Sequence, residues 1–267
     1  MNSLRWLACS APTGALRGTP AGTVVYAIGD IHGRIDLLDT LLPAIERHIG
    51  ERPRRQHVVI FLGDYLSRGM DSRAVVERVL SWPSTLPSNA RVIALKGNHE
   101  DLALCYLAGD LEAGRHWFDY DGLDTLADYG VTTPDAGARD DATLLELRQR
   151  FARVLPQTHL AFFKSLAISH REQDYHFVHA GVRPGVPLAE QTAFDQMWIR
   201  KRFLESDAEH GALVVHGHSI SDQPDVHATR IGIDTGAYAS GVLTCLVLEG
   251  TRQAFMQVRG TPAPAMV

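Results

Sequence analysis

From residue 24 onward, short apolar runs alternate with polar loops and amphipathic segments. The run VVYAI precedes GDIHG, and leucines and isoleucines at helical spacing follow in RIDLLDTLLPAIERHI. Two more units repeat this order, first HVVIFL, GDYLSRG and SRAVVERVLSW, and then ARVIAL, KGNHE and DLALCYLAG. A strand, a polar loop and a helix in succession are typical of βαβ crossovers, so the pattern predicts an α/β fold with a largely parallel sheet.

The three polar loops are expected to lie side by side. Each one follows a predicted strand directly, and parallel strands bring their carboxyl ends to the same edge of a sheet. Ligands of open α/β folds bind beyond these carboxyl ends. The sequence therefore predicts a functional site at this edge.

The pattern divides the chain into three parts. Residues 1–22 are rich in Gly, Pro, Thr and Ala, which predicts a flexible leader. Residues 23–260 are expected to form a single domain with a mainly helical insertion at about 101–165, and short strands return from residue 166. The last two strands, joined by EGTR, predict an antiparallel hairpin, and residues 261–267 predict a frayed tail.

Composition narrows the possible partners and compartment. The 267 residues carry a formal net charge of −5, which argues against a broad nucleic-acid surface. Three widely spaced cysteines argue against a disulfide framework, and no apolar run has the length of a membrane span. We expect a cytoplasmic protein without a nucleic-acid or membrane partner, and the oligomeric state stays open.

Polar residues suited to metal binding gather at the predicted strand ends. Carboxylate, amide and imidazole groups supply hard oxygen and borderline nitrogen ligands for divalent ions, and one central Asp can bridge two ions. His216 is interpreted as a structural neighbour of this set, and Asp234 as an acceptor that shapes its loop. The residues that carry the pattern are Asp30, His32, Asp64, Asn98, His99, His179 and His218.

Five motifs in this order resemble the calcineurin-like metallophosphoesterases, and more narrowly their phosphoprotein phosphatase branch with its bacterial members. They are GDIHG (29–33), GDYLSRG (63–69), GNHE (97–100), HAG (179–181) and GHS (217–219). The resemblance spans residues 24–248. It implies an αββα sandwich, in which two mixed sheets are flanked by helices and the helical insertion forms a cap.

The resemblance also implies a pair of divalent metal ions. Ile220 stands where many relatives outside the branch have another His, so water is expected to complete the first ion's coordination. Manganese is the expected metal, although iron, zinc and magnesium suit similar ligands. The implied ligands are Asp30 and His32 for the first ion, Asp64 for both, and Asn98, His179 and His218 for the second.

The same resemblance assigns the remaining chemistry. Two close cations acidify a shared water and clamp a phosphate, which permits in-line attack by the bridging hydroxide. Arg68 and Arg200 would bind the phosphate as guanidinium forks, together with Asn98, and His99 would protonate the leaving oxygen. Arg200 lies in an RKR run that also suits an exposed helix face. Arg183, in HAGVRPG, is the alternative candidate for this substrate-binding role.

Ser67 departs from the family pattern. Its position is usually an aspartate that hydrogen-bonds the general-acid histidine, raises its pKa and fixes its tautomer. The departure leaves the implied metal ligands intact and concerns the proton donor alone. We expect an active enzyme whose proton step is weaker or is supplied by another carboxylate, such as Asp71 or Asp101.

Three functions fit these residues. The first is a metal-dependent phosphatase of phosphate monoesters, similar to serine/threonine protein phosphatases, and the second is a dinucleoside polyphosphate hydrolase. The third is a metal-bound phosphate or phosphoprotein sensor with little turnover, which Ser67 alone favours. The insertion's aromatic residues either stack on a base or belong to its core, and the core is the default. These residues are Trp117, Phe118, Tyr120 and Tyr129.

Overall fold

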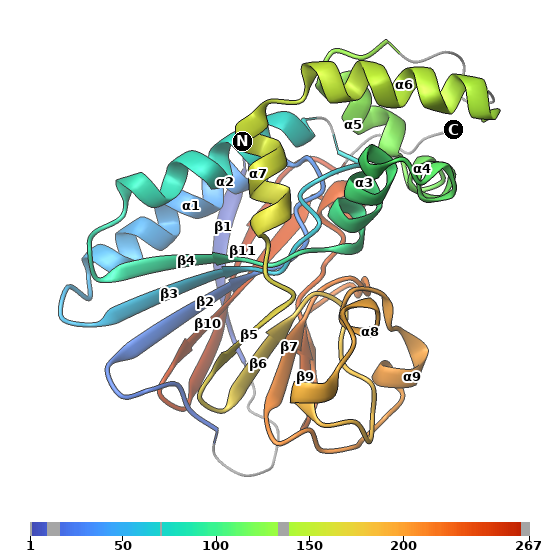
Figure 1. Cartoon of the computed structure of the whole chain (residues 1–267). Helices are drawn as coiled ribbons and strands as arrows, with labels where there is room; N and C mark the ends of the chain where they lie inside the picture. The colour runs from blue at the N-terminus through green and yellow to red at the C-terminus, as the bar shows by residue number, and fades with distance from the viewer. Residues whose placement is uncertain (1, 10–16, 70, 133–138, 263–267) are drawn as a thin grey trace.

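Two mixed β-sheets pack face to face in the computed structural model, which describes residues 2–9, 17–69, 71–132 and 139–262 (Figure 1). The larger sheet has the order β1 (Ser3–Ala8), β11 (Arg252–Arg259), β10 (Val242–Glu249), β2 (Thr23–Ile28), β3 (Gln56–Phe61) and β4 (Ala90–Ala94). The smaller sheet has the order β5 (Ser169–Glu172), β6 (Tyr175–Val178), β7 (Leu213–His216), β9 (Arg230–Gly232) and β8 (Asp225–Val226).

The centre of the larger sheet is parallel, as the repeated strand–loop–helix pattern predicts. Strand β2 pairs with β3, and β3 with β4, both in parallel. Every residue of β2 is buried because helices cover one face of this sheet and the second sheet covers the other. The predicted antiparallel hairpin of β10 and β11 is also present. The expected architecture of two mixed sheets flanked by helices is confirmed.

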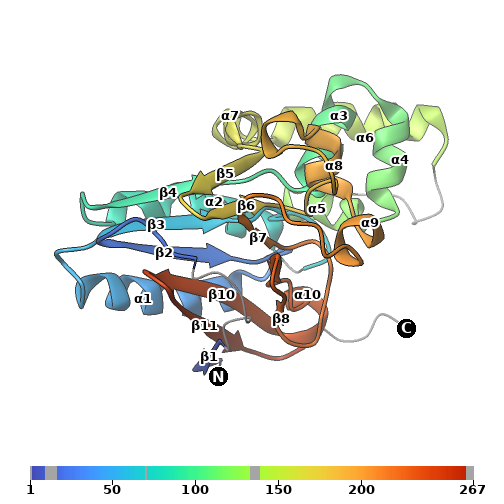
Figure 2. The ribbon, with the colours of Figure 1, turned by 90° about the horizontal axis from the view of Figure 1, so that it is seen from below.

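Helices complete the layers and form a cap (Figures 1 and 2). On the outer face of the larger sheet lie α1 (Ile35–Gly50) and α2 (Ser72–Ser81), which pack against the sheet through buried Leu, Ile and Val side chains. The cap consists of α3 (Asn98–Ala108), α4 (Leu111–Phe118), α5 (Gly122–Asp128), α6 (Asp141–Val154) and α7 (Gln157–Ser165). Two short helices, α8 (Ala193–Trp198) and α9 (Lys201–Leu204), connect β6 to β7 of the smaller sheet. A third, α10 (Ala237–Ser240), lies between β9 and β10.

The N-terminal residues differ from the predicted flexible leader. Ser3–Ala8 forms β1, which pairs antiparallel with β11 from Ser3 opposite Arg259 to Ala8 opposite Ala254. Thr19 is buried, and its backbone N–H donates to the carbonyl of Gly250. The prediction for 1–22 is therefore wrong over the strand, because its partner lies near the other end of the sequence and local composition does not show it. Residues 10–16, and residues 263–267 of the predicted tail, lie outside the described residues.

Two expectations from composition can be compared with the structure. All three cysteines are free: Cys9, Cys105 and Cys245. None of the helices in the described ranges combines the length and the apolar character that crossing a membrane requires.

Candidate metal centre

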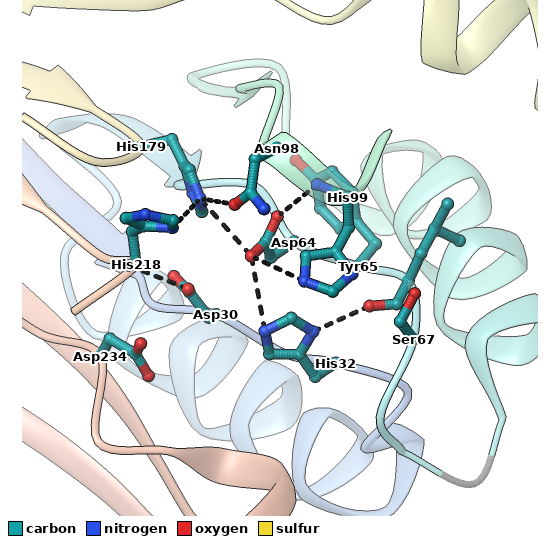
Figure 3. A network of polar contacts seen from close by, with 12 residues as sticks. Asp30, His32, Asp64, Tyr65, Ser67, Asn98, His99, His179, His218 and Asp234 are labelled. Atoms are coloured by element: carbon teal, nitrogen blue, oxygen red, sulfur yellow. Dashed lines mark hydrogen bonds and ion pairs between the residues drawn. The ribbon is translucent and has the colours of Figure 1, made fainter. Parts of the chain in front are cut away.

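The predicted polar residues meet where the two sheets present their carboxyl ends (Figure 3). His32 follows β2, Asp64 follows β3, and Asn98 and His99 begin α3 just after β4. From the smaller sheet, His179 follows β6 and His218 follows β7. All of these side chains are buried. The fold therefore brings together residues that the sequence separates by up to 186 positions, from His32 to His218.

Asp64 lies at the centre of this group. Its Oδ2 is 3.4 Å from Nε2 of His32, 3.4 Å from Nε2 of His179 and 3.9 Å from Nε2 of His99. Its Oδ1 accepts the backbone N–H of His99 at 3.2 Å. Burial raises the pKa of this carboxyl to about 7, so a bound cation would stabilise its charged form. One oxygen facing imidazoles from both sheets suits a ligand shared between two ions.

Backbone carbonyls set the orientation of two imidazoles. His179 donates from Nδ1 to the carbonyl of Leu62 at 2.9 Å, and His32 donates from Nδ1 to the carbonyl of Leu66 at 2.8 Å. A carbonyl can only accept, so Nε2 of each ring carries a lone pair that faces the centre. Burial lowers the pKa of His32 to about 3 and that of His179 to about 4, which keeps both rings in the neutral, metal-ligating form.

A second set of donors, from Asn98, His179 and His218, meets at Nε2 of His179. Nε2 of His179 is 3.0 Å from Oδ1 of Asn98 and 3.2 Å from Nδ1 of His218.

Asp30 accepts the backbone N–H of His218 at its Oδ2, at 2.9 Å, and its buried Oδ1 has no partner among the described residues. Burial, together with the nearby charges of Asp234 and Asp64, raises the pKa of Asp30.

Two overlapping groups of donors fit metal ions. In each group, ligand atoms lie within 4.8 Å of one another, and Asp64 belongs to both: His32, Asp64 and His99 in one, Asp64, His179 and His218 in the other. Carboxylate oxygens and neutral imidazoles suit divalent transition metals. The first group contains His99 and not the predicted ligand Asp30, whose unpartnered Oδ1 remains a further oxygen donor.

The loops around Asp64 hold unusual backbone conformations. Five non-glycine residues at this edge have φ between 45° and 68°, a region that L-residues seldom adopt: His32, Asp64, Ser67, Arg68 and His218. Such strain persists only where the surroundings enforce it. Glycines make room for the turns, because a Cβ on Gly97 would collide with Asp64, and one on Gly217 with Asp30.

Glu100 fixes the loop that follows β3, a role that the sequence analysis missed. Its carboxylate accepts four backbone N–H groups: Asp64 at 3.0 Å, Tyr65 at 2.9 Å, Leu66 at 3.2 Å and Gly97 at 3.0 Å. The side chain is fully buried. An acidic residue directly after Asn98 and His99, at the start of a helix, was the available signal.

A small pocket of about 40 Å³ opens onto the centre. Arg68 and Arg200 both border it, whereas Arg183 does not. Arg183 instead donates from Nε and Nη2 to the carboxylate of Asp195, at 2.9 and 2.6 Å. The pocket is lined by His32, Asp64, Arg68, Asn98, His99, Tyr120, Trp198, Arg200 and His218.

Ser67 has partners in the cap. Its buried Oγ accepts a hydrogen bond from Nε1 of Trp117 at 3.0 Å and lies 3.4 Å from the hydroxyl of Thr125. Nδ1 of His99 has no hydrogen-bond partner within the described ranges. Ser67 is thus bonded to the cap, and no carboxylate among the described residues supports Nδ1 of His99.

Neither suggested substitute reaches that ring nitrogen. Asp71 caps α2 by accepting the backbone N–H of Ala74 at 2.8 Å. Asp101 lies 3.9 Å from Nζ of Lys96. The hypothesis that either carboxylate replaces the missing one at His99 has no support in this geometry.

The remaining candidates separate into core and pocket residues. Trp117, Phe118 and Tyr129 are buried in the core, and of the four aromatic residues only Tyr120 borders the pocket. Trp198 also borders the pocket, stacked on His116 at 5.6 Å between ring centroids, although sequence reasoning did not select it.

The two residues read as structural keep that role. Nδ1 of His216 donates to the carbonyl of Gly217 at 3.0 Å, and His216 does not border the pocket. Asp234 accepts the backbone N–H of Gly236 at 2.9 Å, which shapes its loop as predicted.

Comparisons with known proteins agree with this geometry. A family model described as calcineurin-like phosphoesterase matches residues 23–238. Serine/threonine-protein phosphatase 2 of Salmonella typhimurium is 27% identical over 229 residues, which cover 82% of this chain and 90% of the phosphatase. The symmetrical bis(5'-nucleosyl)-tetraphosphatase of Ralstonia nicotianae is 31% identical over 166 residues, 62% of this chain and 44% of the tetraphosphatase.

Solved structures show the same fold at low sequence identity. A crystal structure described as a putative diadenosine tetraphosphatase covers 93% of this chain and 97% of its own, with a TM-score of 0.58 and 17% identity. A cold-active protein-tyrosine phosphatase of a psychrophilic Shewanella species covers 91% of this chain and 81% of its own, with a TM-score of 0.52 and 17% identity.

Proposed function

Because the chain belongs to the calcineurin-like phosphoesterase family, we propose that it is a dinuclear metal-dependent phosphatase of phosphate monoesters. The chain is a hydrolase of phosphoric esters, as its family and relatives indicate. One observation carries the finer proposal: Oδ2 of Asp64 faces imidazoles from both sheets at 3.4 Å. A relative whose length is 90% covered is named a serine/threonine phosphatase, which supports monoesters as substrates.

The donor groups define the proposed metal ligands. Bound divalent ions would acidify water and neutralise phosphate charge, and manganese is the metal that we propose. Because Asp64 belongs to both donor groups, it is the proposed shared ligand. The other ligands are Asp30 and His32 on one side, and Asn98, His179 and His218 on the other.

The chain's own residues bind the phosphate and handle the proton. Arg68 and Arg200 border the pocket and offer guanidinium forks to phosphate oxygens. Asn98 borders the same pocket, and its amide is a further proposed contact to the phosphate. His99 is the proposed proton donor to the leaving oxygen, and its Nδ1 receives no carboxylate support among the described residues. Substrates whose leaving group departs as a stable anion therefore suit this site best.

Hydrolysis of dinucleoside polyphosphates is the second candidate. It is favoured by the 31% identity to a symmetrical tetraphosphatase and by Tyr120 and Trp198, aromatic rings that border the pocket. Such rings can stack on a base. Adenosine would compete with a dinucleotide substrate and would leave a phosphopeptide substrate unaffected.

Steady-state hydrolysis by metal-stripped protein reconstituted with manganese tests these proposals. Nitrophenyl phosphate, a phosphoserine peptide and diadenosine tetraphosphate are compared, with Asp64→Asn as the inactive reference. Turnover that is lost in Asp64→Asn supports the metal mechanism, and the preferred substrate decides between the two candidates. Asp39→Asn, an exposed carboxylate on α1 that does not border the pocket, is the matched control and should retain turnover. No turnover despite bound metal would refute both proposals and favour a phosphate-binding protein.

A further inference from the structure

Arg68 borders the pocket, and no acidic side chain of the described residues pairs with it. None of the ion pairs or side-chain hydrogen bonds found within the described ranges includes its guanidinium. Its backbone has φ 67°, directly after Ser67 with φ 68°. A long, flexible side chain on a strained turn needs some contact to define its direction, since an unrestrained arginine loses rotamer entropy when it binds a ligand.

Two tyrosine rings supply that contact. The guanidinium carbon of Arg68 lies 4.8 Å from the ring centroid of Tyr238 and 5.9 Å from that of Tyr120. Cation–π attraction acts within about 6 Å of a ring centroid. Tyr238 comes from α10 and Tyr120 from the cap, just after α4, so the rings reach Arg68 from separate parts of the fold. Neither hydroxyl forms a hydrogen bond with another described residue, which leaves the rings themselves as the contact.

A ring holds an arginine without occupying its donors. Arg183 shows the opposite case, because both ends of its fork are bonded to the carboxylate of Asp195. A carboxylate on Arg68 would compete with phosphate for the same N–H groups and would cancel its charge. Aromatic contacts restrict the guanidinium and keep its charge and its donors available.

The same rings touch other groups of the site. Tyr238 lies edge-on to His32, with ring centroids 5.4 Å apart, and Tyr120 lies 6.0 Å from the ring of His99. Each ring therefore contacts Arg68 and one histidine of the centre. This arrangement fixes the distance between the cationic group and the residues proposed to act on the phosphate.

We propose that Tyr120 and Tyr238 are positioning residues that hold Arg68 for the phosphate of the substrate. This role rests on the proposed phosphatase function, because it assigns Arg68 to phosphate binding. It makes the cap part of the phosphate site through Tyr120. Loss of either ring should weaken phosphate affinity through Arg68.

Affinity for inorganic phosphate tests the proposal without depending on turnover. Titration calorimetry on the manganese-loaded full chain would compare Tyr238→Leu and Tyr120→Leu with the wild type. Each leucine variant should weaken phosphate binding by about 5- to 30-fold, the range expected for a partly desolvated cation–π contact. Tyr238→Phe and Tyr120→Phe keep the rings and should restore most of the affinity. Trp6→Leu, which removes an exposed ring on β1 that does not border the pocket, is the matched control.

A double-mutant cycle with Arg68→Ala separates positioning from a general structural effect. In the Arg68→Ala background, the leucine substitutions should change phosphate affinity by less than about twofold. Equal losses with and without Arg68, or a failure of the phenylalanine variants to restore binding, would overturn the proposal. Tyr238 also contacts His32, a proposed metal ligand, so the metal content of each variant is measured. Equal metal content shows that weaker phosphate binding does not come from weaker metal binding. If the wild type binds phosphate and the cycle holds while no ester is hydrolysed, only the proposed function fails.

Discussion

Nε1 of Trp117 donates a 3.0 Å hydrogen bond to Oγ of Ser67, and this pairing ties the loop after β3 to the cap. Where the family usually has a carboxylate, the chain has a hydroxyl bonded to a buried indole. Nδ1 of His99 is left without a partner in the described part of the chain. Ser67 therefore contributes to packing against the cap, whereas His99, the proposed proton donor, has no partner at Nδ1 among the described residues.

Ser67→Asp should raise turnover most for substrates with poor leaving groups. A carboxylate near His99 would favour its protonated form, and aspartate tolerates the left-handed backbone at this position, φ 68°. We expect roughly a 10- to 100-fold gain on an alkyl phosphate and a much smaller gain on nitrophenyl phosphate. The measurement is kcat on both esters with equal metal content.

Ser67→Asn is the control for this change. It has the size of aspartate but no charge, so it should leave the ratio of the two rates near the wild-type value. Equal gains on both esters in Ser67→Asp would show that the serine has no bearing on leaving-group protonation.

Arg200→Ala should reduce phosphatase activity far more than Arg183→Ala. Arg200 borders the pocket, whereas both ends of the Arg183 fork bind Asp195. Loss of one charge-stabilising donor is worth roughly 10²–10³ in rate, and we expect this loss of kcat/KM for Arg200→Ala. Arg183→Ala should change kcat/KM by less than about threefold, since a partly exposed ion pair contributes little. A larger effect at Arg183 would place its side chain at the substrate.

Glu100→Gln should lower the free energy of unfolding by about 2–5 kcal/mol. Each carboxylate oxygen accepts two backbone N–H groups at the turn that carries Asp64. The substitution replaces one oxygen by an amide nitrogen, which cannot accept, so two of the four N–H groups lose their acceptor. Urea unfolding of metal-free protein measures the change. Glu112→Gln, an exposed side chain on α4, should stay within about 0.5 kcal/mol of the wild type. Similar values for both variants would show that the turn does not depend on Glu100.

Stability should fall as pH decreases, in part because of His176 on β6. Burial lowers the pKa of this ring to about 4 from 6.5, and the positive charge of Arg171 acts in the same direction. The unfolded chain therefore binds a proton between pH 6.5 and 4 that the folded chain excludes, so stability is lost as pH falls through this window. The loss from this one group is about 3 kcal/mol over the window.

Urea unfolding at pH 6 and pH 5 compares wild type with His176→Leu. The leucine variant should lose about 1.2 kcal/mol less than wild type over this pH unit. His227→Leu, at an exposed position, should behave like wild type. Identical losses in wild type and His176→Leu would show that His176 is solvated in the folded chain.

The sequence by itself determined the parallel centre of the larger sheet and the edge at which the polar loops meet. Both follow from local rules, because hydrophobic periodicity fixes each element and parallel crossovers bring strand ends to one side. The motifs also identified the residues that the fold brings around Asp64, from His32 to His218. Short motifs succeed here because each sets the backbone of one turn, and that backbone positions its own side chains.

Only the tertiary structure decided which partners these residues have. Strand β1 exists because β11 pairs with it, and Ser67 is bonded to an indole from the cap. The structure likewise shows that Asp195 occupies the fork of Arg183, and it places two tyrosine rings within 6 Å of the guanidinium carbon of Arg68. Each of these contacts joins elements whose relative placement depends on how the whole core packs. Local propensity and spacing carry no information about such pairings, because packing over the entire chain establishes them.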